Sequence, residues 1–142
     1  MGSTPEEEAM IDCITEHCRD VKDAARYKGF SKFTKNKTDE EKALLRKEWF
    51  DTDMPAMLRK INDVVQETGS VDAKNSEGYA FGSSVTFADV AIWALLRDCG
   101  SGDAEDTKKA AEGCEALNAI VEMVAKNPGV ARYLEERPDS VF

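Results

Sequence analysis

Apolar residues recur every three or four positions along most of the chain, which is the spacing of one helical face. The first such segment starts at Thr4 and Pro5, a pair that favours a helix start, and Gly29 is placed to end it. We therefore predict a helix between these residues, with an apolar face made of Met10, Ile14, Cys18, Val21 and Ala25.

A second capping signal follows a polar loop. Thr38 and Glu41 are three positions apart, the spacing of a capping box, and the helical pattern continues from there to Thr68. Pro55 lies inside this segment and lacks a backbone N–H, so we predict a kink or short break near Thr52.

The segment from Val85 to Leu96 combines a cap signal with an apolar run. Thr86 Oγ1 can accept from the N–H of Asp89, and the Asp89 carboxylate can accept from the N–H of Thr86. From Val90 onward this segment has no polar face. A helix that is apolar on every side belongs inside a domain, so we predict a central buried helix with a structural cap.

The rest of the chain is divided by turn-forming residues. Residues 69–84 predict a loop, and two further helices are predicted over 106–126 and 130–136, the second opened by Asn127 and Pro128. The apolar positions expected to pack down within the loop are Tyr79, Ala80 and Phe81.

These elements predict an all-α fold. No stretch alternates apolar and polar residues between turns, as a strand would. We expect a bundle of about five to six helices around the buried helix at Phe87–Leu96. With 142 residues the chain is long enough for its own core, and we take residues 1–142 as a single domain.

The overall charge disfavours two classes of partner. The formal net charge of −9 argues against nucleic acid and against anionic membrane surfaces. No apolar run approaches the ~20 residues needed to span a bilayer, and no secretory pattern opens the chain. We expect a cytoplasmic protein that binds neither nucleic acid nor membrane. One basic loop, with Lys28, Lys32, Lys35 and Lys37, is an exception that we interpret as a solvated linker.

Side chains suited to catalysis or metal binding are scarce. With one histidine, His17, and four cysteines without a C-x-x-C pair, we expect no metal site and reduced thiols, mostly in the core. Cys13 shares a helical face with His17, but nothing in the sequence would orient a base. Asp12, Glu16, Asp20 and Asp23 form an acidic line on the first helix, and the first three repeat every four residues. This line is either a solvated face or a surface that meets a cation.

Three motifs resemble the C-terminal helical domain of cytosolic glutathione transferases, most closely the sigma class and its alpha, mu and pi relatives. They are the helix start at residues 4–12, the glycine-then-cap segment at 79–89, and the C-terminal end at 127–138. The Met54–Pro55 step also fits. The resemblance covers nearly the whole chain and implies an electrophile-binding half of a glutathione S-transferase, which conjugates glutathione to hydrophobic electrophiles in detoxification.

The resemblance implies different roles for the two domains of the enzyme. Glutathione, the co-substrate, binds mainly to a thioredoxin-like N-terminal domain, where a Tyr or Ser hydroxyl stabilises its thiolate. The helical domain supplies no catalytic residue and no cofactor, but it forms most of the electrophile pocket, and the enzyme is a homodimer. Asp20 corresponds to an aspartate that reaches across the dimer to the α-amino group of glutathione, a charge-assisted contact.

The electrophile pocket is implied at the end of the first helix and on the facing side of the central helix. The pocket residues on this basis are Lys22, Asp23, Tyr27, Phe30, Ala91 and Leu95. Tyr27 would either stack on a flat electrophile or pack in the core. Thr86 and Asp89 keep their structural role.

The chain departs from the family in one respect. No β-α-β pattern, catalytic tyrosine or cis-proline strand precedes Thr4, so we expect the thioredoxin-like domain to be absent and the chain alone to be inactive. We favour a piece of a longer transferase over a gene that encodes the helical half alone. The alternative function is a non-catalytic interaction module for protein–protein assembly, in which the acidic line binds a basic partner.

Overall fold

The computed structural model describes residues 4–68, 78–82, 84–97 and 103–136, and these residues form helices without any β-strand. The elements are α1 (Pro5–Lys28), α2 (Asp39–Glu48), the π-helical turn η1 (Trp49–Asp53), α3 (Met54–Thr68), α4 (Phe87–Arg97), α5 (Ala104–Ala110), α6 (Glu115–Lys126) and α7 (Pro128–Glu136). Because α2, η1 and α3 follow one another without a break, they form one long rod. The all-α prediction is confirmed.

Helix starts follow the capping signals in the sequence. Thr4 Oγ1 accepts a hydrogen bond from the N–H of Glu7 at 3.1 Å and thereby caps α1, which ends at Gly29 with φ of 87°. At α2 both bonds of the Thr38–Glu41 capping box are present, each 3.2 Å long. These two predicted helix starts are confirmed.

The predicted break before Pro55 takes the form of the π-helical turn η1. The N–H of Met54 donates to the carbonyl of Trp49, five residues back, in place of the usual four. The helix therefore passes the proline with one extra residue in a single turn, and α3 continues to Thr68.

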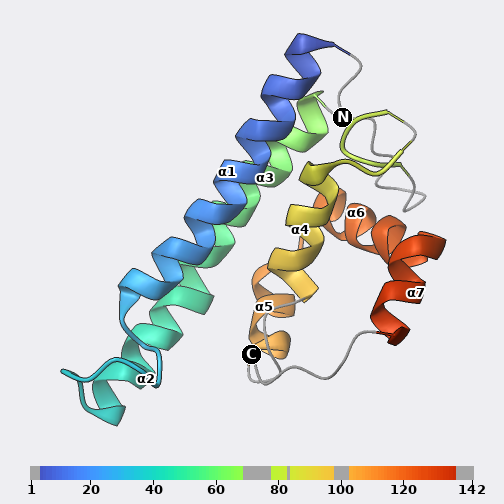
Figure 1. Ribbon diagram of the computed structural model, residues 1–142. Coiled ribbons are helices and arrows are strands. Elements are labelled where there is room, and N and C mark those ends of the chain that lie inside the picture. Colours follow the sequence, from blue (N-terminus) through green and yellow to red (C-terminus); the bar gives the residue numbers. More distant parts are fainter. Residues whose placement is uncertain (1–3, 69–77, 83, 98–102, 137–142) are drawn as a thin grey trace.

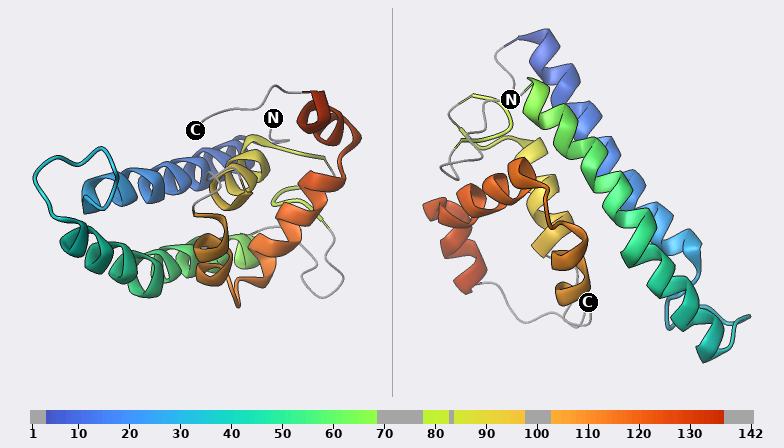
Figure 2. Two further views of the ribbon diagram at one scale, coloured as in Figure 1. Left: turned by 90° about the horizontal axis from the view of Figure 1, so that it is seen from below. Right: turned by 180° about the vertical axis from the view of Figure 1, so that it is seen from behind.

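The helices form two layers, which Figures 1 and 2 show from three sides. α1 runs antiparallel to the α2–η1–α3 rod, and this pair is a long hairpin whose α2 end projects beyond the other helices. α4 packs against α1 on one side and against α5 and α6 on the other, while α7 packs against α6. The buried side chains between the layers include Ile14, Val21, Leu58, Ile61, Ile92, Leu96, Leu117 and Ile120.

The prediction for α4 is confirmed in part. Ile92 and Leu96 are buried and the helix is central, but Phe87 is 61% exposed and Val90 is 42% exposed. Burial on every side is therefore wrong for this chain. The lack of a polar face showed that α4 is central, but it could not show that one side remains open.

The helix predicted over 106–126 is two helices. α5 ends at Ala110, and Gly113 turns the chain with φ of 84° before α6 begins at Glu115. Apolar residues keep the helical spacing on both sides of the turn, because both helices bury one apolar face against the same core. Periodicity alone therefore did not reveal the break. The apolar residues at helical spacing across both helices are buried: Ala110, Cys114, Leu117, Val121 and Val124.

Candidate functional site

The Asp89 carboxylate is the most completely buried charged group among the described residues. Its Oδ1 accepts from the N–H of Ala80 at 2.7 Å, and its Oδ2 accepts from both the N–H and the hydroxyl of Thr86 at 2.8 Å. Asp89 is fully buried, as are Ala80 and Phe81, so these loop residues pack down as predicted. The side chain therefore fixes the start of α4 and also holds the preceding loop against it.

Burial dominates the electrostatics of Asp89. Desolvation raises the pKa of its carboxyl above the ordinary value of 3.8, and the hydrogen bonds from Ala80 and Thr86 partly oppose this rise. These three donors, two backbone N–H groups and one hydroxyl, all tie the loop and the helix start together. Within the described residues the group thus acts as a cap, in agreement with its predicted structural role.

The acidic line on α1 lies at the surface. Asp12, Glu16 and Asp20 are all exposed, and Glu16 pairs with Arg19 at 3.3 Å. α1 packs against α4, and Val21 is buried. Asp20, the preceding residue, lies on another face of the helix, and its carboxylate is exposed to solvent. This exposure fits both a solvated face and a surface that meets a cation.

The other residues of α1 that were predicted to line the pocket lie in different surroundings. Lys22 is exposed, and Asp23 pairs with Arg26 one turn later. Tyr27 is 85% exposed, so the alternative that it packs in the core is wrong. A ring this exposed is free to contact a ligand or a partner surface.

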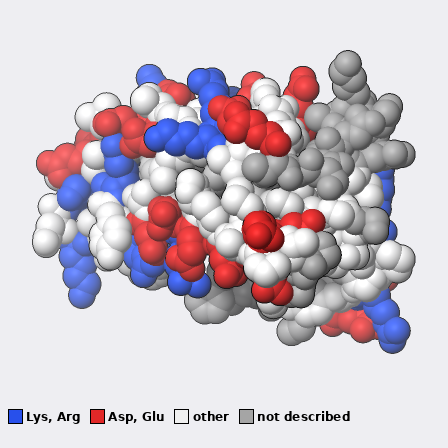
Figure 3. Space-filling model, turned by 90° about the horizontal axis from the view of Figure 1, so that it is seen from above, with Lys and Arg blue, Asp and Glu red and all other residues white. Residues whose placement is uncertain are grey.

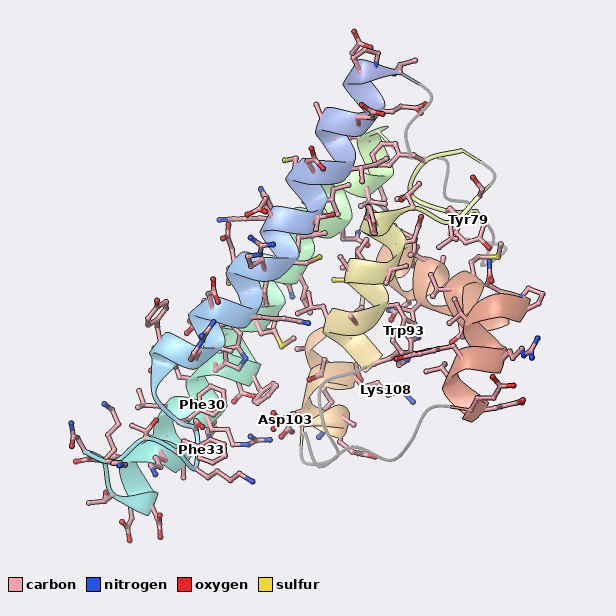
Figure 4. All side chains as sticks on the ribbon, in the orientation of Figure 1. Phe30, Phe33, Tyr79, Trp93, Asp103 and Lys108 are labelled. Atoms are coloured by element: carbon pink, nitrogen blue, oxygen red, sulfur yellow. The ribbon has the colours of Figure 1, made fainter. Side chains whose placement is uncertain are left out.

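Phe30 belongs to an aromatic cluster at the α2 end of the hairpin. Its ring centroid lies 6.4 Å from that of Trp49 and 6.0 Å from that of Phe50. The guanidinium of Arg46 lies 4.8 Å from the Phe50 centroid and 5.9 Å from the Phe30 centroid. Figure 4 shows Phe30 beside α2 and well away from Trp93 on α4. Phe30 therefore packs within the hairpin.

Arg46 also joins the hairpin to the second layer. Its two terminal nitrogens donate to Asp103 at 2.7 Å and to Asp106 at 2.8 Å, at the start of α5. These pairs raise the pKa of the Arg46 guanidinium against the effect of its burial. Sequence reasoning missed this residue. Asp103 and Asp106 lie more than fifty residues after Arg46 in the sequence. No local pattern connects an arginine in one helix with acids at the start of a later helix.

The two residues of α4 that were predicted to line the pocket differ in exposure. Leu95 is 6% exposed and belongs to the core, whereas Ala91 is half-buried. Because α1 and α4 pack side by side, the fold brings together the two helices that carry the predicted pocket residues. It does not gather all the side chains, since Tyr27 points to solvent and Phe30 packs on Trp49.

The described residues offer little chemistry of their own. Cys18 and Cys114 are buried as predicted, while Cys13 is exposed. Burial raises the pKa of the Cys18 thiol to about 12 and raises that of Cys114, so neither is a thiolate at neutral pH. No three His, Cys, Asp or Glu side chains in the described part of the chain are grouped to hold a metal ion. Over the same residues, no helix is long and apolar enough to cross a bilayer.

Comparison with known families gives a match over most of the chain. The family described as "Glutathione S-transferase, C-terminal domain" matches residues 25–137, which run from the last turn of α1 to the end of α7. A comparison with curated proteins found no match. The family match covers most of the chain and agrees with the all-α fold.

Proposed function

Because the chain belongs to the glutathione S-transferase C-terminal domain family, we propose that it is the electrophile-binding half of a glutathione S-transferase. The observation that carries this proposal is the family match over residues 25–137. In the complete enzyme, the glutathione thiolate attacks a hydrophobic electrophile, and a thioredoxin-like domain stabilises that thiolate. We assign the protein to the sigma-like group, as a cytoplasmic homodimer for detoxification, with residues 1–142 as one domain.

The electrophile pocket in this proposal lies where α1 and α4 pack together. In this proposal exposed Tyr27 on α1 offers an aromatic face, while half-buried Ala91 and buried Leu95 offer apolar surface on α4, which packs against α1. Lys22 and Asp23 supply polar groups at the rim, and the Phe30 cluster supports the end of α1. This arrangement suits a flat hydrophobic ligand, since such pockets combine apolar walls with few polar groups.

Asp20 is the proposed contact to glutathione across the dimer. Its carboxylate is exposed on α1, and an ammonium group such as the α-amino group of glutathione would form a charge-assisted hydrogen bond with it. Asp20, Lys22 and Asp23 precede the residues matched by the family, so their roles rest on the motif resemblance at the helix start.

A conjugation assay tests the division of labour. The 142-residue chain is mixed with glutathione and chlorodinitrobenzene, and product is followed by absorbance. We expect no turnover above the uncatalysed rate, and turnover appearing when a separately produced thioredoxin-like transferase domain is added. Glutathione-dependent turnover by the chain alone would contradict the proposal.

The role of Asp20 is tested in the same reconstituted enzyme. Asp20→Asn should raise KM for glutathione about tenfold, because a hydrogen bond to a charged group is worth roughly 1.5–3 kcal/mol, while kcat stays near the parent value. Asp12→Asn, which removes an equally exposed carboxylate two turns earlier, is the matched control and should leave KM unchanged. Equal KM values for the two variants would remove Asp20 from the site.

The second candidate function is a non-catalytic interaction module. The exposed acidic line Asp12, Glu16 and Asp20 favours it, because such a face suits a basic partner. Light scattering and pull-down at low and physiological salt distinguish the two functions. A monomeric chain that recovers no partner would leave this second function without support.

A further inference from the structure

The last turn of α1 and the loop that joins it to α2 form a strongly basic stretch of the chain. Between Asp23 and Asp39 there are five basic residues and no acidic one. Residues 24–38 thus contribute +5 to the net charge of −9, and the rest of the chain carries −14. Figure 3 shows Lys and Arg side chains at the end of the molecule that this loop and α2 form, on the left, where Asp and Glu side chains also lie. A net positive charge is therefore concentrated in this stretch, next to the acidic first turn of α2.

Three of the five basic groups remain available. Arg26 pairs with Asp23, and Lys28 pairs with Glu48 and Asp53 at 2.8 Å each. No ion pair among the described residues involves the other three, which are exposed: Lys32, Lys35 and Lys37.

An aromatic ring stands at the apex of the same loop. The N–H of Thr34 donates to the carbonyl of Ser31 at 3.0 Å, and the N–H of Phe33 donates to Ser31 Oγ at 3.2 Å. These bonds form a turn with Lys32 and Phe33 at its centre. Phe33 is 79% exposed, and Lys32 Nζ lies 5.1 Å from its ring centroid. The structure therefore holds a large apolar ring in water beside a cation.

Other exposed apolar groups lie at the same end of the molecule. Of the six large hydrophobic side chains that are exposed among the described residues, three lie on this end: Tyr27, Phe33 and Leu44. Figures 1 and 4 show the loop at the projecting end of the hairpin, with Phe33 on it. We propose that this end, residues 27–44, docks onto the surface of an anionic lipid bilayer, with Phe33 entering the headgroup region and Lys32, Lys35 and Lys37 facing lipid phosphates.

The acidic remainder of the molecule does not prevent this contact. Asp20 lies about 13 Å from Gly29 along the helix axis, at 1.5 Å per residue, which exceeds the screening length of about 8 Å at physiological salt. Closer to the loop, the first turn of α2 carries three acids, Asp39, Glu40 and Glu41. The helix dipole, worth about half a charge, compensates them only in small part, but the lysines of this end outnumber them: Lys32, Lys35, Lys37 and Lys42. The overall charge, which led us to exclude membranes, therefore does not describe this end.

The shape of the loop favours a bilayer over nucleic acid. Binding of single strands uses a basic groove in which successive bases stack on aromatic rings. Here one ring lies at the apex of a projecting turn, which suits a flat surface touched by the tip alone. A long polyanion would also lie against the acidic remainder of the chain.

Vesicle sedimentation tests the proposal with the full chain. Vesicles of phosphatidylcholine alone are compared with vesicles of phosphatidylcholine and phosphatidylserine in equal amounts. We expect binding only to the second kind, with loss at 1 M salt, where the screening length falls to about 3 Å. Sedimentation independent of phosphatidylserine, or absent altogether, would overturn the proposal, as would binding of polyuridylate without binding of vesicles.

Two variants separate the apolar and the charged contributions. Phe33→Ser should lower the affinity for the mixed vesicles about tenfold, and a Lys32→Gln, Lys35→Gln double variant about 25-fold, since each lysine near an anionic surface contributes about fivefold. Tyr133→Ser removes an aromatic ring that is 63% exposed on α7 and is the matched control, with no loss expected. All variants change exposed side chains, and circular dichroism verifies that they fold. Parent-like affinity of both loop variants would overturn the proposal.

Discussion

The side-chain oxygen of Asn62 accepts a hydrogen bond from the backbone N–H of Leu117, with 3.2 Å between the two atoms. Leu117 is the third residue of α6, so its N–H has no partner within that helix. Cys114, at the N-cap position, makes no side-chain cap bond. α6 is therefore capped from α3, and the two layers of the fold share this bond at a position where Asn62 is 6% exposed.

Asn62→Leu should destabilise the chain by about 1–3 kcal/mol, because it leaves a buried N–H of α6 without an acceptor. Urea denaturation followed by circular dichroism measures the change. Gln66→Ala, one turn later on the exposed side of α3, is the matched control and should stay within about 0.5 kcal/mol of the parent. An equal midpoint for both variants would mean that water replaces Asn62.

Asp89→Ala should cost about 3 kcal/mol or more. The substitution leaves the N–H of Ala80, the N–H of Thr86 and the Thr86 hydroxyl without their acceptor in a buried site. Thermal melts of the variant and the parent give the difference. Asp12→Ala on the exposed face of α1 should leave the melting temperature nearly unchanged, and a similar result for Asp89→Ala would show that the buried cap does not form.

The pH dependence of stability has a defined sign at Asp89. Its folded-state pKa is raised above 3.8, so the folded chain holds this proton to higher pH than the unfolded chain does. The stability contributed by the protonated group is present below pH 3.8 and is lost as pH rises through the folded pKa. The free energy of unfolding of the parent should therefore fall relative to that of Asp89→Asn between pH 3.8 and the folded-state pKa. Above the folded-state pKa the difference between the two proteins should stay constant. A parent that gains stability relative to Asp89→Asn over the same interval would contradict the raised pKa.

Arg46→Met should cost about 1 kcal/mol, less at high salt, because it removes the pairs with Asp103 and Asp106. The loss of stability is small because the Arg46 side chain is 34% exposed and water screens its ion pairs. Urea denaturation at low and high salt checks both the size and the salt effect. Arg132→Met, which removes an exposed pair with Glu136, should change the stability by less than half as much.

Thiol labelling should separate the cysteines by burial. Cys13 is exposed and should react within the folded protein, while Cys18 and Cys114 should react only after unfolding, because burial holds both as thiols. Peptide mapping by mass spectrometry after a short exposure to iodoacetamide identifies the labelled residue. Rapid labelling of Cys18 in the folded chain would contradict its burial.

The helix starts could be predicted where neighbouring residues in the sequence form the cap. Caps at Thr4, Thr38 and Thr86 act within three residues, so the sequence alone locates them, and Pro55 marks the π-helical turn. The break at Gly113 was missed because a glycine in a left-handed turn leaves the apolar period intact on both sides. Contacts between distant helices, such as Asn62 with Leu117, have no local signal.

The candidate site shows the same division. The resemblance selected α1 and α4, which do pack together, but it could not give the direction of each side chain. The Tyr27 ring points to water and the Phe30 ring packs on Trp49, although the two residues are only three positions apart in the sequence. The direction of Phe30 depends on its contacts with Trp49 and Phe50 of η1, which lies later in the chain.

The π-helical turn keeps the two halves of the α2–α3 rod in phase. Each residue of an α-helix rotates the next by about 100°, so one extra residue in regular winding would rotate α2 by that angle about the rod axis. In η1 the extra residue is taken up in a single wide turn, closed by the bond from the N–H of Met54 to the carbonyl of Trp49. Arg46 therefore faces Asp103 and Asp106, which an added residue without the wide turn would prevent.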